Sequence, residues 1–178
     1  MKESLPQIHE QLAQLGYSLK PFSQEDEGGL YEIFQEVVDS GTQFPYECSS
    51  LQEFHRQFFA PLSHVYVCHS SNNEVVGGFY IRSNFSGRSS HIANAAYMIR
   101  WTHRGQGVGT LLAAASLEIA KNLGFQAMQF NMVLTQNIIA LKLYEKLGFN
   151  IVGTLSKAVR NPDGSYQDGC IMYRKLDT

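Results

Sequence analysis

The chain has 178 residues, of which 44% are hydrophobic and 17% charged, and its formal net charge is −2. These values predict one globular domain over residues 1–178 with a sizeable core. The weak negative charge and the absence of a basic run argue against a nucleic-acid partner. Without a run of about 18 apolar residues, no membrane span is expected.

The N-terminus and the cysteines bear on the compartment. Charged residues such as Lys2 and Glu3 stand where a signal peptide would need an apolar segment. Cys48, Cys68 and Cys170 are odd in number and lack metal-ligand spacing. We therefore expect a cytoplasmic protein with reduced thiols and no bound metal.

Apolar periodicity and turn residues predict helices that alternate with strands along the chain. The first helix, within an N-terminal extension over residues 1–16, is expected at 3–15. Further helices are predicted at 23–39, 51–59, from near Gly107, and at 137–147. Strands are predicted at 17–20, 64–69, 75–82, 92–99, 125–133, 149–159 and 170–176. The Asn161–Gly164 turn joins the last two strands, and the whole pattern predicts a mixed α/β sheet.

A glycine-rich loop, Arg104-Gly105-Gln106-Gly107-Val108-Gly109, stands between an apolar strand and a long helix. Glycines let the backbone approach a ligand, and the first amides of a helix attract phosphate. Arg104 adds a cation suited to phosphate oxygens. Thr110 and Leu111 follow where a P-loop needs lysine, and residues 127–129 lack the carboxylate of a dinucleotide fingerprint. The loop therefore predicts a phosphate site of another kind.

A second motif about thirty residues later gives the loop its context. The two together resemble the GCN5-related N-acetyltransferase (GNAT) superfamily, whose coenzyme loop reads Gln/Arg-x-x-Gly-x-Gly/Ala. Its later helix reads Asn-x-x-Ala-x-x-Leu-Tyr-x-x-x-Gly-Phe. The matching residues are Arg104, Gly107 and Gly109 in the first motif and Asn137, Ala140, Leu143, Tyr144, Gly148 and Phe149 in the second. The resemblance is firm over residues 92–152, expected to be the acetyl-CoA-binding core, and thin before Val65.

The resemblance implies an α/β (α+β) fold with a largely antiparallel, twisted sheet of about six or seven strands flanked by helices. It also implies that acetyl-CoA lies between the strands that end near Ile99 and Val133. A backbone amide near Met98 or Ile99 would stabilise the oxyanion when an amine attacks the thioester. The residues implied in coenzyme binding are Tyr97, Met98, Ile99, Arg104, Gly105, Gln106, Gly107, Val108, Gly109, Thr110, Asn137 and Tyr144.

Asn137 and Tyr144 are the expected catalytic pair. Seven residues apart, they share one helix face over a rise of about 10 Å. The amide of Asn137 suits the amides of a pantetheine arm. The phenol of Tyr144 can protonate a departing thiolate, because its ordinary pKa of about 10 lies above that of a thiol. A core role with a satisfied hydroxyl is the alternative for Tyr144.

The proton acceptor for the amine stays open. Many relatives carry a glutamate on the strand before the phosphate loop, but residues 91–99 contain no carboxylate. A water chain, His91, Glu47 or Asp168 are the candidates. The amine can also arrive neutral.

Asparagine is unusual within strands, and Asn94 and Asn131 both fall in strands expected to border the reaction gap. They look similar to the asparagines of a fungal branch that acetylates proline analogues, where they contact a small carboxylate-bearing amine. Backbone hydrogen bonds are the alternative for both. Tyr46 and Phe85 can also line the acceptor pocket. The residues expected to bind the acceptor are therefore Asn94, Asn131, Tyr46 and Phe85.

The leading interpretation is an N-acetyltransferase that transfers an acetyl group from acetyl-CoA to a small-molecule amine: an amino acid, polyamine or antibiotic-like compound. A protein N-terminal or lysine acetyltransferase and a noncatalytic acyl-CoA sensor are the alternatives. The long 41–60 insertion favours a covered site for a small acceptor. A homodimer stays open.

Overall fold

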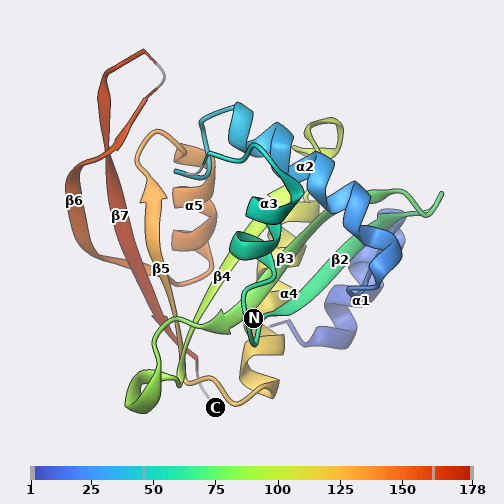
Figure 1. Cartoon of the computed structure of the whole chain (residues 1–178). Coiled ribbons are helices and arrows are strands. Elements are labelled where there is room, and N and C mark those ends of the chain that lie inside the picture. Colours follow the sequence, from blue (N-terminus) through green and yellow to red (C-terminus); the bar gives the residue numbers. More distant parts are fainter. Residues whose placement is uncertain (1–2, 46, 162, 177–178) are drawn as a thin grey trace.

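The computed structural model describes residues 3–45, 47–161 and 163–176. One seven-stranded sheet in the order β1-β2-β3-β4-β5-β7-β6 runs through it, antiparallel everywhere except between β4 and β5 (Figure 1). The predicted mixed, largely antiparallel sheet is thereby confirmed. Its strands are β1 (Tyr17–Pro21), β2 (His64–Ser70), β3 (Val75–Ser83), β4 (Ile92–Ile99), β5 (Ala127–Leu134), β6 (Asn150–Arg160) and β7 (Tyr166–Lys175).

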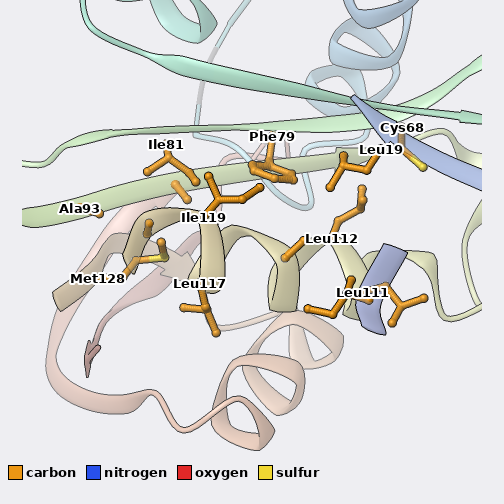
Figure 2. Close-up of a cluster of buried hydrophobic side chains, with 14 of the residues drawn as sticks. Leu19, Cys68, Phe79, Ile81, Ala93, Leu111, Leu112, Leu117, Ile119 and Met128 are labelled. Atoms are coloured by element: carbon orange, nitrogen blue, oxygen red, sulfur yellow. The ribbon is translucent and has the colours of Figure 1, made fainter. Parts of the chain in front are cut away.

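Five α-helices of the described residues cover the two faces of the sheet (Figure 1). They are α1 (Leu5–Gln14), α2 (Glu27–Asp39), α3 (Leu51–Phe58), α4 (Val108–Asn122) and α5 (Ile138–Lys146). α2 and α3 pack on one face through aromatic side chains such as Phe34 and Phe58. α1, α4 and α5 cover the other, and Figure 2 shows Leu112 and Ile119 of α4 beside Phe79 of β3. Among the described residues, no helix is long and apolar enough to cross a bilayer.

The parallel contact between β4 and β5 is short, and this creates the gap on which the site depends. The two strands pair only at Ile92 with Ala127 and at Ala93 with Met128. Beyond these positions they diverge, while β4 continues to pair with β3 up to Ile99. A bulge between Phe130 and Val133 bends β5 at the same level. The second half of β4 therefore has one edge without a partner strand.

Two predicted elements start four residues away from the predicted position, while the other starts agree within two residues. The helix expected from residue 23 begins as a 3₁₀ turn over Gln24–Asp26, and α2 starts at Glu27. The last strand starts at Tyr166 rather than at 170, because its pairing with β6 runs to the hairpin end at Arg160. Sequence patterns place element ends poorly, since pairing and capping decide them. Pro162 of the predicted turn lies outside the described residues.

A buried hydrogen bond between Asp26 and His69 fixes the start of α2 against β2. The Oδ1 atom of Asp26 lies 2.7 Å from Nε2 of His69, and its Oδ2 atom accepts from the amide and hydroxyl of Ser23. Both members of the pair are buried. Burial acts to raise the pKa of the Asp26 carboxyl, but the hydrogen bonds from Ser23 and His69 outweigh it, and the pKa lies below its ordinary value.

We expect Asp26→Ala to lower the free energy of unfolding by about 2 kcal/mol, because it leaves His69 and the Ser23 amide without acceptors. A depressed carboxyl pKa gives stability that is present above the unfolded pKa of about 4 and is lost as pH falls through the folded pKa. Urea unfolding of wild type and variant should therefore differ at pH 7 and converge in acid. The exposed Asp39→Ala is the matched control, and equal stabilities of wild type and Asp26→Ala at pH 7 would refute the assignment.

Candidate active site

The loop before α4 places two glycines in a conformation that other residues rarely adopt. Gly105 has φ 76° and Gly107 has φ 85°, and Gly107 is the N-cap of α4. A Cβ atom at either position would meet no other atom within 4 Å. The space beside the loop is therefore open to a ligand, while the positive φ angles favour glycine.

The amides at this helix start have no acceptors in the protein. Thr110 and Leu111 donate to the carbonyl of Gly107, but among the described residues nothing accepts from the amides of residues 105–109. Five adjacent free donors at the positive end of a fifteen-residue helix form a site for an anion such as a diphosphate. Within residues 105–110, only the amide of Thr110 donates to another described residue.

Neighbouring side chains hold this loop. Tyr17 of β1 donates to Oε1 of Gln106 at 2.7 Å and lies 3.0 Å from Nδ1 of His103. Gln106 also donates to the carbonyl of Thr102. These bonds connect the first strand to the loop, which limits the ordering that a ligand must impose.

Arg104 has protein partners rather than the free position expected of a phosphate ligand. Its Nε atom donates to the carbonyl of Ile99 at 3.0 Å, and Nη2 donates to Gln43 at 3.4 Å. Its guanidinium lies 4.8 Å from the ring centroid of Trp101. Arg104 thus links the end of β4 to the segment after α2, and positive charge still stands beside the loop.

The register of β4 decides which of its backbone groups face the gap. Asn84 donates to Ile92 and Arg100 donates to Val76, so even-numbered residues of β4 bond to β3. The amides of Tyr97 and Ile99 therefore point toward the gap. The amide of Met98 points toward β3, which removes it as the expected oxyanion donor.

A cavity of about 170 Å³ occupies the gap between β4 and β5. Its walls come from β3, β4, β5, α5 and the segment after α2. Among the described residues, its lining is Gln43, Phe44, Pro45, Tyr80, Arg82, Asn94, Ala95, Ala96, Tyr97, Phe130, Asn131, Met132, Val133, Leu134, Asn137, Ala140 and Tyr144.

Tyr144, on α5, forms part of the wall of this cavity. The centroid of its ring lies 4.4 Å from that of Phe130 and 6.0 Å from that of Tyr97. Its hydroxyl bonds to no residue that the structure describes. Burial raises the pKa of Tyr144, which keeps the phenol protonated. Burial likewise raises the pKa of Tyr97, whose hydroxyl lies 2.7 Å from that of Ser116. Tyr144 is therefore the phenol available to a ligand.

The sequence predicted Asn137 as the first residue of the helix. In the structure it is the N-cap that precedes α5. Its Oδ1 atom accepts from the amide of Ala140 at 3.1 Å, as asparagine commonly does at this position. Its side-chain amino group stays available at the cavity wall. The donor half of this amide can thus serve a ligand, but the acceptor half is engaged.

Asn94 and Asn131 line the cavity, but their polar atoms have protein partners. Asn94 accepts from the hydroxyl of Tyr80 at 3.2 Å and donates to the carbonyl of Gln129 at 2.9 Å. It thereby bridges β4 and β5 where their pairing ends. Asn131 exchanges two hydrogen bonds with the side chain of Asn84. Asn94 therefore makes the backbone hydrogen bond given as the alternative. Asn131 instead pairs with the amide of another side chain.

The remaining acceptor predictions fare differently. Phe85 does not line the cavity; it is 44% exposed in the loop after β3, because the chain has left the sheet by that point. Tyr46 lies outside the described residues. Arg82 was not among the predicted site residues, although it is the one charged residue of the mostly apolar β3. That contrast is the signal that could have identified it.

Among the described lining residues there is no carboxylate and no imidazole. His91 is exposed and bonds to the carbonyl of Arg88. Glu47 is exposed outside the lining, and Asp168 accepts from the amide of Lys157. None of the three candidate bases lines the described cavity.

A helix start with free amides, beside a cavity lined by a phenol, can hold a phosphate-bearing ligand with its reactive end between two strands. The acetyltransferase (GNAT) family model matches residues 30–149 of the chain. The chain belongs to this family, and the predicted resemblance is confirmed.

Individual relatives agree with this membership. The chain is 40% identical over 86 residues to the N-acetyltransferase aca1 of Schizosaccharomyces pombe, a match covering 48% of this chain and 41% of that protein. The chain thus spans less than half the length of this curated relative. A GCN5-related N-acetyltransferase from Kribbella flavida has a TM-score of 0.85 at 28% identity, covering 90% of this chain and 98% of that one.

The chain also has the same fold as an acetyltransferase that was solved with its ligand bound. A phosphinothricin acetyltransferase from Sinorhizobium meliloti, solved in complex with acetyl-CoA, has a TM-score of 0.82 at 20% identity. The likeness covers 90% of this chain and 89% of that one.

Proposed function

We propose that this protein transfers an acetyl group from acetyl-CoA to the amine of a small molecule. The observation that carries the proposal is the row of free amides at residues 105–109 beside the gap that Tyr144 enters. Family membership supports the reaction, and the S. meliloti structure, named for acetyl-CoA and phosphinothricin, supports the donor and the size of the acceptor. With three free cysteine thiols, we place the protein in the cytosol.

The residues divide the chemistry between them. The amides of residues 105–109 bind the diphosphate, and the backbone of Tyr97 and Ile99 binds the pantetheine arm along the free edge of β4. The acceptor nitrogen forms a bond to the thioester carbon, and the carbon–sulfur bond breaks. The amide of Tyr97 or Ile99 donates to the developing oxyanion. Tyr144 gives its proton to the leaving thiolate, and the proton of the amine passes to water.

The acceptor is small because the segment after α2 closes part of the cavity. Gln43, Phe44 and Pro45 form part of its wall, and Phe44 packs on Phe34 of α2 with ring centroids 5.7 Å apart. A peptide acceptor would need an open groove in the place that this segment occupies. A volume of about 170 Å³ suits an amine of amino-acid size.

Thiol release from acetyl-CoA tests the proposal. Purified protein should release coenzyme A with some members of a panel of amino acids, polyamines and antibiotic-like amines. It should release no coenzyme A with peptides. Turnover on peptides alone would favour a protein acetyltransferase. Tight binding of acetyl-CoA without turnover on any amine would favour an acyl-CoA sensor.

The described cavity lacks a base, and this predicts an unusual pH dependence. We expect kcat/KM for the acceptor to rise tenfold per pH unit up to the pKa of the acceptor's own amine, because only the neutral amine attacks. Two acceptors that differ in amine pKa should shift the midpoint by that difference. A midpoint fixed near pH 6.5 for both acceptors would instead identify a histidine base.

A further inference from the structure

Arg82 is the only charged residue in the described lining of the cavity. It is partly buried, yet no carboxylate of a described residue pairs with it. Arg100, in contrast, contacts Glu32, Glu36 and Glu74. A partly buried guanidinium without a counter-charge is costly, and a ligand can supply that charge.

The guanidinium of Arg82 is held in place by neutral groups. Nη1 donates to the carbonyl of Gln57 on α3 at 3.1 Å, and Nη2 donates to the hydroxyl of Tyr80 at 3.1 Å. The group also lies 4.2 Å from the centroid of the Tyr80 ring. These contacts use two of its N–H groups and leave the others, with the full charge, for another partner.

Arg82 lies on the opposite face of the sheet from Tyr144. It pairs with Asn94 across β3 and β4, and its bond to Gln57 places it on the face that α2 and α3 cover. Tyr144 and Tyr97 pack into the core on the face of α4 and α5. An acceptor in the cavity can therefore contact Arg82 with one end and place its amine in the gap.

The two asparagines are poorly placed to recognise an anion. Asn94 already uses both its oxygen and its amino group within the protein, and Asn131 is paired with Asn84. Each amide keeps at most one free N–H and carries no charge, whereas Arg82 keeps its other N–H donors and a full positive charge.

We infer that Arg82 selects acceptors carrying an anionic oxygen group, such as a carboxylate or a phosphinate, at the end away from the amine. This inference rests on the proposed function and names the acceptor of that same site. Arg82 binds this group through its free N–H donors, and it disfavours polyamines because their second charge is positive.

The test compares each amino acid with its uncharged carboxamide, and adds an aminophosphinate as a second anion. At a pH above the amine pKa of both acceptors, where both amines are neutral, wild type should use the acid at least about tenfold better in kcat/KM than the carboxamide, as for one charge-assisted hydrogen bond. Arg82→Gln should remove this preference by raising KM for the acid, while KM for acetyl-CoA stays unchanged. Arg82→Lys should restore part of the preference. The exposed Arg88→Gln, with the same charge change, should behave as wild type.

Acetyl-CoA binding is measured in parallel by calorimetry, which separates the two proposals. Failure to bind acetyl-CoA would overturn the proposed function. Three outcomes with normal acetyl-CoA binding would overturn only the role of Arg82. They are equal turnover of acids and carboxamides, a preference for polyamines over both, and turnover on no anionic amine. So would an Arg82→Gln variant that loses kcat equally on acid and carboxamide, since that loss would be structural.

Discussion

Gly107→Asp is expected to weaken acetyl-CoA binding by two to three powers of ten. The new carboxylate would stand at the N-cap of α4, in space that no protein atom now occupies within 4 Å. Two unit charges 4 Å apart near a protein surface repel by about 4 kcal/mol, and this energy corresponds to that loss of affinity. Trp101, the only tryptophan, is 68% exposed next to the loop, so its fluorescence can follow the titration.

Two controls separate charge from backbone strain. Gly107→Ala keeps the strain of a positive φ, but the strain is present with and without ligand, so the dissociation constant should change by less than about tenfold. Gly124→Asp places the same residue at φ 88° beyond the far end of α4. It should cost stability alone. Normal binding by Gly107→Asp would remove the loop from the donor site.

Tyr144→Phe should lower kcat about 100-fold without weakening acetyl-CoA binding, since positioned general acids contribute factors of this size. Because burial raises the pKa of Tyr144, the phenol keeps its proton above its ordinary pKa of about 10. Its ionisation should therefore cause no loss of kcat on the alkaline side below that pH. Steady-state and single-turnover kinetics would measure both effects.

Tyr66→Phe is the matched control for this change. Tyr66 stacks on Phe79 with ring centroids 5.4 Å apart and does not line the cavity between β4 and β5. Removing its hydroxyl should leave kcat as it is. An unchanged kcat in Tyr144→Phe would end the assignment of Tyr144 as the acid.

The sequence predicted the elements of the glycine loop and of α5 far better than the contacts of the residues expected to bind the acceptor. The glycine loop and the helix with Tyr144 are local motifs, and short spacing determines which backbone amides and side chains they present. Their elements occur in the structure within a few residues of the predicted bounds. The phosphate loop needed no knowledge of distant contacts.

The acceptor side depends on contacts between distant segments. Arg82 reaches the cavity because α3 supplies the carbonyl of Gln57, which lies 25 residues earlier. Asn94 and Asn131 could be placed beside the gap from the sequence, but their partners could not. The partners come from Tyr80 and from Asn84, a loop residue 47 positions away from Asn131. Only the assembled sheet shows that these amides are engaged.

The same limit explains the backbone of β4. The largely apolar run predicted a buried strand at its observed bounds, Ile92–Ile99. It could not assign Tyr97 and Ile99 to the gap and Met98 to β3, because pairing register is set by the neighbouring strand. Similarly, Arg104 was expected to bind phosphate, but its side chain donates to the carbonyl of Ile99. This contact depends on the turn between the two residues.

The central claim is that the helix start at residues 105–109 binds the diphosphate of acetyl-CoA. Isothermal calorimetry of the purified chain with acetyl-CoA tests it most directly. We predict saturable binding at one site, with a dissociation constant between about 1 μM and 1 mM. Heat no greater than that of dilution, up to millimolar acetyl-CoA, would contradict the claim.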